Sequence, residues 1–387
     1  MRIIFVSGAM KDSDFNSYVK DAKFNINPSN QNFHYRFLKA LGTATPVTAL
    51  TLRPFAKGLF DINKLPEASS QDDNITFKYL ADETGRLYKL FVREANIAKT
   101  LQNELKESDT VILVDSMKYA LAKTALRLGK KNRIKVFGII TDNPRLLSNE
   151  SSLYCRAITS LYKKYDGFIA LSKGLNELAN VGNKPTYIFH GFAEELPEIV
   201  KKEQKPYFFC CGALYERYGI LNMIEAFKQL KTDYELLIAG HGPLISTIKA
   251  IEQQDQRIHY LGLLPKEQIR DYEHNAALNI NPRLFDAKLD KYSVPSKVLE
   301  YLASGTPLLS TMHTTLHDEF CGEAIWIKDG SIDELRKAME LFLKLQTNDL
   351  KKKALLAKQK VLEHYGLKVQ GQKIYEFLLA NSSFSNN

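Results

Sequence analysis

Residues 281–307 read NPRLFDAKLDKYSVPSKVLEYLASGTP and lie between two apolar runs of strand length, Ala277–Ile280 and Pro307–Ser310. Proline at position 295 is tolerated in the first turn of a helix, and Gly305 is typical of a helix end. The stretch therefore predicts a helix that starts near Pro295 and leads, after Gly305, into the next buried strand. A strand, a helix and a further strand in this order indicate a parallel α/β sheet.

The beginning of this predicted helix is a candidate anion site. Ser296 can cap free backbone amides, and the amides of a helix N-terminus bind phosphate groups. A diphosphate would fit there, beside Lys297. Glu300 falls about one turn after Ser296 on the same helix face, from which its carboxylate could hold vicinal ribose hydroxyls. The structural alternative is that Glu300 is only a first-turn acid and Lys297 only a surface residue.

The same alternation of strands and helices extends along the chain in two series. The first series is expected to have strands at Ile3–Ser7, Val47–Leu52, Thr110–Val114, Val136–Ile140, Gly167–Leu171 and Thr186–Phe189. The second is expected to have strands at Tyr207–Cys211, Tyr234–Ala239, Ile258–Tyr260, Ala277–Ile280, Pro307–Ser310 and Ala324–Ile327. Between the two series lies a polar segment with prolines near both ends, which has the composition of a linker.

These series predict an α/β chain of two Rossmann-like domains that face each other across a cleft. We expect the first domain over residues 1–192, a linker over 193–206, the second domain over 207–365, and a C-terminal helix with a disordered tail over 366–387. Residues 332–377 are almost wholly helical in pattern, with a break at His364–Gly366, and the last helix is expected to pack back on the first domain.

Length and composition agree with two domains, because 387 residues exceed what one core usually supports. The N-terminus reads as a first strand rather than as a signal peptide, and no stretch approaches the roughly 20 apolar residues of a membrane span. We therefore expect a cytoplasmic protein, soluble or peripheral at the inner face of the membrane. The four cysteines show no CxxC spacing and are expected to be reduced and buried.

Positive charge is concentrated between Lys118 and Lys135, where seven Lys or Arg occur without an acid in a chain of formal charge +9. Such a basic face could meet anionic lipid, phosphate-bearing ligands or nucleic acid. The alternative is a solvated helix face, which carries no function.

The sequence PSKVLEYLASGTP at 295–307 resembles the donor-site signature of the retaining GT-B glycosyltransferases of family 4. Further stretches are similar to that family: the glycine turn at Gly240–Pro243, the strand and loop at His259–Pro265, and the segment Gly212–Gly219 before a helix. The resemblance is strong over 205–330 and weaker, though collinear, over 1–192. It implies the GT-B fold, with a bacterial polysaccharide-type subgroup as the nearest pattern.

The resemblance also implies roles for individual residues. On the donor side, Glu300 would bind ribose, Ser296 and Lys297 would lie by the diphosphate, and the backbone near Leu263 would lie by the base. On the N-terminal side, Gly8 would let the backbone approach the reacting sugar, and Asp142 stands near an acceptor-side polar group. The structural alternatives are that Gly8 is only a turn glycine and that Asp142 is only a loop residue.

Three positions depart from the family pattern where the chemistry would be. The phosphate-binding Arg and Lys of the family correspond to Ala213 and Tyr218, and the first Glu of its paired-glutamate motif corresponds to Tyr292, which we still count with the donor residues. Without those cations a departing diphosphate would lack positive charge. We expect the replacements to be Arg217, Arg283 and Lys297, although Arg217 is equally readable as a surface residue at a helix start.

Three functions remain in contention at this stage. The leading hypothesis is a hexosyltransferase-type enzyme that moves a sugar, with retention, from a nucleotide sugar to a polysaccharide, lipid-linked oligosaccharide or protein acceptor. No Asp-x-Asp pair directly follows a predicted strand and no His/Cys cluster has metal spacing, so no metal cofactor is expected. The expected partners are a nucleotide sugar and the acceptor, and no nucleic-acid partner is expected. The alternatives are a glycosyltransferase-like subunit that has lost catalysis and, more remotely, a nucleotide-sugar epimerase.

Overall fold

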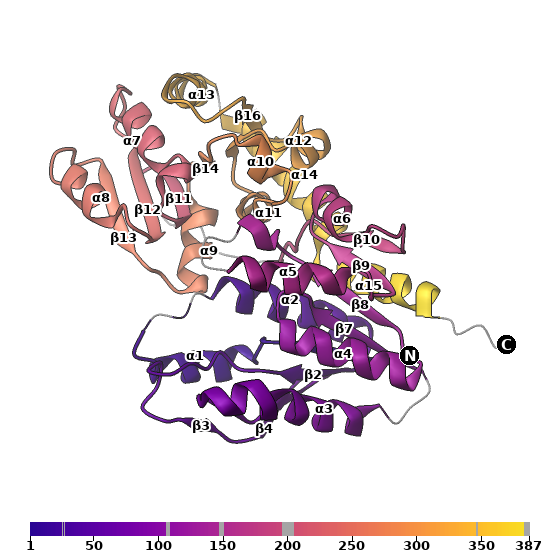
Figure 1. Cartoon of the computed structure of the whole chain (residues 1–387). Coiled ribbons are helices and arrows are strands. Elements are labelled where there is room, and N and C mark those ends of the chain that lie inside the picture. The colour runs from indigo at the N-terminus through magenta and orange to yellow at the C-terminus, as the bar shows by residue number, and fades with distance from the viewer. Residues whose placement is uncertain are drawn as a thin grey trace. The chain divides into compact units, whose positions relative to one another are not determined.

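The computed structural model describes residues 1–24, 26, 28–105, 109–146, 151–195, 205–345 and 347–382. The chain divides into two compact units (Figure 1). Unit 1 comprises Met1–His190, Lys291–Ser293 and Leu367–Asn387, and unit 2 comprises Gly191–Asp290 and Val294–Gly366. Nine of the residues expected to form the linker, 196–204, lie outside the described residues, as do 383–387 at the C-terminus.

Unit 1 is built on an eight-stranded sheet with the order β10-β9-β8-β7-β1-β2-β5-β4, parallel except for the β4–β5 pair. Its strands are β1 (Arg2–Ser7), β2 (Val47–Thr51), β4 (Ala68–Asp72), β5 (Ile75–Tyr79), β7 (Thr110–Asp115), β8 (Val136–Ile140), β9 (Gly167–Ala170) and β10 (Thr186–Ile188), with a separate pair β3 (Lys64–Leu65) and β6 (Asp82–Glu83). Its helices are α1 (Asp12–Lys20), α2 (Ser29–Ala44), the π-helix η1 (Tyr88–Val92), α3 (Arg93–Glu104), α4 (Tyr119–Asn132), the 3₁₀-helix η2 (Pro144–Leu146), α5 (Ser152–Tyr162), α6 (Lys173–Ala179) and α15 (Leu367–Ser382).

The core of unit 1 follows from alternation along buried strands. In β1, Ile4 and Val6 pack into a cluster with apolar residues of α3, α4 and α5. Phe5, between them, points to the other face and stacks on Phe37 of α2, with ring centroids 5.5 Å apart. Helices therefore cover both faces of the sheet.

The C-terminal helix α15 packs on α2, as expected from the sequence (Figure 1, yellow helix among the indigo and magenta elements of unit 1). A Cβ atom at Gly371 would lie only 1.9 Å from the carbonyl oxygen of Ala40, so the two helix backbones can approach this closely only with glycine at 371. The predicted break is confirmed too, because one helix ends at Tyr365 and α15 begins at Leu367.

Unit 2 holds a six-stranded parallel sheet with the order β13-β12-β11-β14-β15-β16. Its strands are β11 (Tyr207–Ala213), β12 (Glu235–His241), β13 (Ile258–Gly262), β14 (Leu278–Asn281), β15 (Leu308–Thr311) and β16 (Ile325–Ile327). Its helices are the 3₁₀-helix η3 (Glu216–Tyr218), α7 (Ile220–Lys228), α8 (Ile245–Glu252), α9 (Lys266–Asn275), α10 (Ala287–Asp290), α11 (Ser296–Ser304), α12 (Thr314–Phe320), α13 (Ile332–Lys344) and α14 (Thr347–Tyr365).

The adjacent cysteines 210 and 211 show how this sheet separates two cores. Cys210 packs with residues of α7 and α13 on one face, and Cys211 packs with residues of α11 and α14 on the other. All four cysteines are free, as expected, and Cys155, Cys210 and Cys211 are buried. The expectation was wrong for Cys321, which is exposed just after α12.

The predicted strands of both series are all present, with ends that differ by at most a few residues. The β4–β5 hairpin was missed, because the sequence analysis predicted no strand between Leu52 and Thr110. The hairpin turns at Asp73, which has a positive φ of 49°, and β4 is exposed and polar along most of its length. Within the described residues, the helices lack the combination of length and apolar character that crossing a membrane requires.

Candidate active site

The carboxyl edge of the unit 2 sheet carries most of the predicted site residues. The turns after β11 and β12 touch there, since a Cβ atom at Gly240 would lie 1.9 Å from the carbonyl oxygen of Gly212. Gly240 itself has a φ of 139°, which favours glycine. The neighbouring strand β14 ends at Asn281 and leads to Arg283, so the side chains that follow β11, β12 and β14 share one edge.

Helix α11 begins at Ser296, where the sequence predicted it. Its N-cap residue is Pro295, whose ring offers no hydrogen-bond acceptor, and no side chain at that position caps the helix. Ser296 is the first residue of α11 and not its N-cap residue, so it does not cap the helix from the N-cap position. The first amides of α11 keep the character of an anion site.

Lys297 is held between two glutamates. Its Nζ lies 2.6 Å from Oε2 of Glu300, one turn further along α11, and 3.5 Å from Oε1 of Glu273 on α9. Desolvation acts to lower the pKa of Lys297, but the carboxylates of Glu300 and Glu273 and the Cys211 thiol outweigh it and hold this pKa well above its ordinary value. The ammonium is therefore charged and fixed in place at the start of the helix.

Glu273 is a member of this group that sequence reasoning missed. Its side chain is 2% exposed, and burial raises its pKa to about 7, with Lys297 acting against the rise and Glu300 adding to it. The Cys211 thiol also lies 3.5 Å from Glu273 Oε1. Periodicity could have placed Glu273 on the inner face of α9, beside Ile269 and Tyr272, but the sequence contains no signal for its contact with α11.

The raised pKa of Glu273 predicts a pH-dependent stability. Below the ordinary carboxyl pKa both the folded and the unfolded chain carry this proton, whereas between that value and about 7 only the folded chain keeps it. The contribution to the free energy of unfolding therefore falls as the pH rises through this window. We expect the Tm of Glu273→Gln to rise relative to that of the wild type from about pH 5 to about pH 7, and the difference to level off above that pH.

Thermal unfolding of the two proteins across this pH range measures the effect, and each kcal/mol shifts Tm by about 2–4 °C in a domain of this size. The matched control is Glu267→Gln, because Glu267 is an exposed acid on the same helix. A Tm difference between Glu273→Gln and wild type that stays constant with pH would contradict the assignment.

Arg217, Arg283 and Tyr218 form a second group on this edge. The guanidinium carbon of Arg217 lies 5.0 Å from the centroid of the Tyr218 ring, and that of Arg283 lies 5.9 Å from the same centroid. Arg283 also forms an ion pair of 2.9 Å with Asp290. Tyr218 stands where the resembling family has a cation, and both arginines predicted as replacements contact its ring.

Large apolar side chains are exposed on the segments that follow four strands of this sheet. The most exposed is Leu263, at 72%, which the sequence placed beside the nucleotide base. The others are Tyr215 after β11, Phe285 after β14 and Met312 after β15, and the sequence analysis did not single them out. Exposed apolar groups beside cations are suited to a ligand with a flat ring and a charged tail.

In unit 1, Gly8 and Asp142 both follow strands at the carboxyl edge, after β1 and β8. A Cβ atom at Gly8 would lie 3.4 Å from the Leu52 carbonyl oxygen, an ordinary contact, so packing alone does not demand glycine there. The Asp142 side chain reaches solvent, yet desolvation by the surrounding protein raises its pKa. The roles of both residues stay predictions.

A buried pair near Asp142 was also missed. Asp115 ends β7, and its Oδ2 lies 3.2 Å from Nε2 of His34 on α2, with both side chains fully buried. Burial acts to raise the pKa of Asp115, but His34 and Lys118 outweigh it and lower this pKa. A polar residue at the end of a buried strand was a visible signal for Asp115, whereas His34 gave none.

Tyr292 differs most from its expected setting. It was predicted with the donor residues of the second domain, but Lys291–Ser293 belongs to unit 1. Tyr292 packs against the core of that unit, and the Ser172 hydroxyl donates to the Lys291 carbonyl oxygen at 2.9 Å. A Cβ atom at Gly174 would lie 2.3 Å from the same oxygen, so this segment is closely fitted to unit 1.

In the part of the chain that the structure describes, no three His, Cys, Asp or Glu side chains gather in a group that could hold a metal ion. His190 Nδ1 lies 3.1 Å from the Leu171 carbonyl oxygen, which suits a structural histidine.

Comparison with known proteins identifies the domain that holds the Lys297 and Arg283 groups. Residues 192–360 match the family described as glycosyl transferases group 1. The colanic acid biosynthesis glycosyltransferase WcaL of Escherichia coli (strain K12) is 23% identical over 175 residues, which cover 43% of each chain. The amylovoran biosynthesis glycosyltransferase AmsK of Erwinia amylovora is 32% identical over 107 residues, 26% of each chain. The chain thus spans less than half the length of these curated relatives.

Solved structures match over almost the whole chain. Sucrose-phosphate synthase of Thermosynechococcus elongatus has a TM-score of 0.67 at 15% identity and covers 99% of this chain and 100% of its own. HepE of Anabaena, solved in complex with UDP and glucose, has a TM-score of 0.66 at 12% identity over 98% and 100%. At these identities the likeness shows the fold, which is GT-B.

Proposed function

We propose that this protein is a glycosyltransferase (EC 2.4) of polysaccharide biosynthesis, because residues 192–360 match the glycosyl transferases group 1 family and the whole chain has the GT-B fold. The observation that carries the proposal is at the carboxyl edge of the unit 2 sheet, where Lys297 lies in the first turn of α11 and Arg283 follows β14. The relatives WcaL and AmsK bear names of glycosyltransferases of colanic acid and amylovoran biosynthesis, which supports the acceptor class.

The donor in this proposal is a nucleotide sugar. HepE was solved with UDP and glucose, and a trehalose-6-phosphate protein of E. coli, with a TM-score of 0.69 at 12% identity, was solved with UDP-2-fluoro glucose. Here Glu300 would accept the ribose hydroxyls, because a carboxylate offers about four acceptor positions. The base would lie by Leu263, and the diphosphate by Ser296 and Lys297.

The reaction we propose moves the sugar with retention of configuration to a polysaccharide, lipid-linked oligosaccharide or protein acceptor. As the bond from the anomeric carbon to the diphosphate oxygen breaks, negative charge grows on the diphosphate. Arg283, Lys297, Arg217 and the amides of α11 would stabilise that charge, and the departing phosphate would take the proton of the acceptor hydroxyl. Asp142 and Gly8 would serve on the side of unit 1.

A screen of nucleotide sugars tests this function, with thermal stabilisation and donor hydrolysis as the two readouts. We expect one nucleotide sugar both to stabilise the protein and to be slowly hydrolysed without acceptor. Stabilisation without any turnover, even with crude glycan acceptors, would favour a binding subunit, for which Ala213, Tyr218 and Tyr292 are the supporting departures. An isomerised sugar nucleotide as product would instead indicate an epimerase.

We also propose that turnover needs no metal ion, because the sequence has no Asp-x-Asp pair directly after a strand. Adding EDTA to the active protein should therefore leave kcat nearly unchanged. The control is an assay after extensive dialysis with and without added Mg²⁺ or Mn²⁺. A large loss that either ion restores would show that a metal takes part.

We also propose a location: the protein is cytoplasmic and binds the inner face of the membrane through the basic stretch Lys118–Lys135. Five of its cations line a cavity of about 740 Å³ at the end of α4, together with Lys164, Asp166 and apolar residues that include Leu126 and Leu161. Two of these five cations are partly neutralised by acids, because Lys123 pairs with Glu94 at 2.9 Å and Lys135 pairs with Asp166 at 3.2 Å.

Co-sedimentation with liposomes checks this location. Binding should require anionic lipid, because each basic residue near such a surface contributes about 1 kcal/mol, and it should fade as salt rises. Arg127→Ala with Lys130→Ala should weaken it roughly tenfold or more. Neutral liposomes are the control. Sedimentation that depends on neither lipid charge nor salt would indicate that the basic stretch is only a solvated helix face.

A further inference from the structure

A separate cavity opens at the amino edge of the unit 2 sheet, opposite the edge that carries Lys297 and Arg283. It lies among the segments that precede the strands, with Pro206 before β11, Tyr234 before β12, Ala277 before β14 and Pro307 before β15. Its volume is about 480 Å³, within the range of about 300–1,000 Å³ that ligand pockets occupy. Nothing in the proposed transfer reaction uses it.

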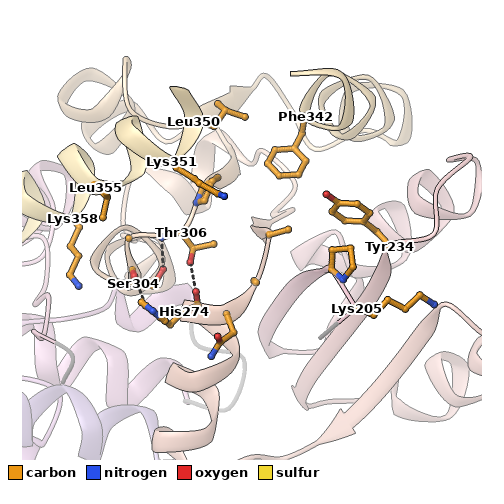
Figure 2. A pocket seen from close by; sticks show the side chains of 16 residues that line it. Lys205, Tyr234, His274, Ser304, Thr306, Phe342, Leu350, Lys351, Leu355 and Lys358 are labelled. Carbon is orange, nitrogen blue, oxygen red and sulfur yellow. Dashed lines mark hydrogen bonds between the residues drawn. The ribbon is translucent and has the colours of Figure 1, made fainter. Parts of the chain in front are cut away.

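Much of the lining is apolar. Figure 2 shows the rings of Tyr234 and Phe342 on one side of the cavity, with Leu350 and Leu355 of α14 on another. Phe342 is 3% exposed and belongs to the core, whereas Leu355 is 60% exposed although it lines the cavity. An exposed leucine in the wall of the cavity, with two aromatic rings on another side of it, offers contact area to an apolar ligand.

The charged lining residues are all basic. Lys351 and Lys358 come from α14, one on each side of Leu355, and Lys205 lies across the cavity (Figure 2). Lys205 pairs with Glu235 at 3.1 Å. No ion pair joins Lys351 or Lys358 to a carboxylate among the residues that the structure describes, and the described lining contains no Asp or Glu.

One of these two lysines is positioned by the end of α11. Gly305, which ends that helix with a φ of 73°, has its Cα so close to Lys358 that a Cβ atom there would lie 3.1 Å from Lys358 Cδ. The aliphatic stem of Lys358 therefore packs along the helix end, and its ammonium group remains available for a ligand.

The polar groups of the floor are already bonded to one another. The Thr306 hydroxyl donates to the His274 carbonyl oxygen at 3.0 Å, and His274 Nδ1 lies 3.1 Å from the Ser304 carbonyl oxygen, as the dashed lines in Figure 2 mark. The Ser304 hydroxyl donates to the Tyr301 carbonyl oxygen at 2.6 Å. A sugar or base, which needs many hydrogen bonds, would find few partners here.

We propose that this cavity binds an amphipathic anion, namely an alkyl, acyl or prenyl chain that ends in a phosphate or carboxylate group. The chain would lie against Tyr234, Phe342 and Leu355. The head group would lie between Lys351 and Lys358, where each ammonium can donate charge-assisted hydrogen bonds. The site is independent of the donor edge and of the proposed transfer reaction.

Calorimetric titration of the full chain tests the proposal, with laurate, dodecyl phosphate, dodecanol and inorganic phosphate as probes below their aggregation concentrations. We expect saturable binding of laurate, dodecyl phosphate or both, which identifies the head group. Dodecanol and inorganic phosphate should bind at least about tenfold more weakly, because each lacks one half of the recognised chemistry.

The variant Lys351→Ala with Lys358→Ala should weaken binding of the preferred anion at least about tenfold. Lys352→Ala with Lys353→Ala is the matched control, since both are exposed lysines of α14 that do not line the cavity. Leu355→Ser should weaken binding of the chain without changing charge. UDP binding should be equal in all variants, which separates a failure here from a failure of the proposed function.

Three results would overturn the proposal: no saturable binding of either anion, equal affinity for dodecanol, or an equal loss in both lysine pairs.

Discussion

Replacing Arg283 or Lys297 by alanine should lower kcat by about 10²–10³-fold, the usual effect of removing one preorganised donor from a developing anion. Donor binding should weaken less than turnover falls, because the diphosphate charge grows only as the glycosidic bond breaks. Arg217→Ala should have a smaller effect, since Arg217 contacts the rings of Tyr215 and Tyr218 and has no ion pair with a described carboxylate. The measurement is kcat and KM with the donor found by the screen.

Controls must separate lost charge from lost folding. Lys297→Ala leaves Glu273 and Glu300 without the cation between them, and Arg283→Ala leaves Asp290 without its partner. Lys297→Arg and Arg283→Lys keep the charge and should retain more turnover than the alanine variants. Arg336→Ala is the matched control, because Arg336 is also ion-paired in unit 2, with Asp333 and Glu340 on the exposed face of α13. Near-normal kcat in all three alanine variants would mean that other groups hold the diphosphate.

Replacing Glu300 by alanine should weaken UDP binding by about 10–150-fold, since hydrogen bonds to a charged group are worth about 1.5–3 kcal/mol. The loss combines two effects: the ribose hydroxyls lose their acceptor, and Lys297 loses the carboxylate at 2.6 Å that positions it. Calorimetry with UDP measures the change. Glu300→Gln keeps an acceptor but not the charge, so it should fall between alanine and wild type.

Comparing Glu300→Ala with Glu273→Gln separates the loss of the ribose acceptor from the loss of a Lys297 partner. Glu273 touches Lys297 from α9 but has no predicted contact with ribose, so Glu273→Gln should alter UDP affinity much less than Glu300→Ala does. Glu267→Ala, at an exposed position of α9, should leave affinity unchanged. Unaltered UDP binding by folded Glu300→Ala would remove this residue from the donor site.

Much of the candidate site could be predicted because its residues are neighbours in the chain. Ser296, Lys297 and Glu300 lie within two turns of one helix, so helical spacing alone places them together. The same is true of Arg217 and Tyr218 in one short turn. Resemblance to a family then supplied the roles, which periodicity does not provide.

The residues that sequence reasoning missed are those whose contacts join distant segments. Glu273 and Lys297 are 24 positions apart, and His34 and Asp115 lie on different elements of unit 1. Such pairs depend on how two elements pack, and the residues next to them in the chain do not indicate that packing. The β4–β5 hairpin was missed for another reason: β4 is polar and exposed along most of its length, so no buried face marks it.

The sequence by itself determined the α/β alternation, the strands of both series, the helix that starts at Ser296 and the break before Leu367. These features follow from local preferences and from burial with periods of two or 3.6 residues. Only the tertiary structure decided that Tyr292 belongs to unit 1, that Tyr218 contacts two arginines and that Lys297 lies between two glutamates. The physical reason is that side-chain partners across elements are selected by packing and desolvation, which depend on the whole fold.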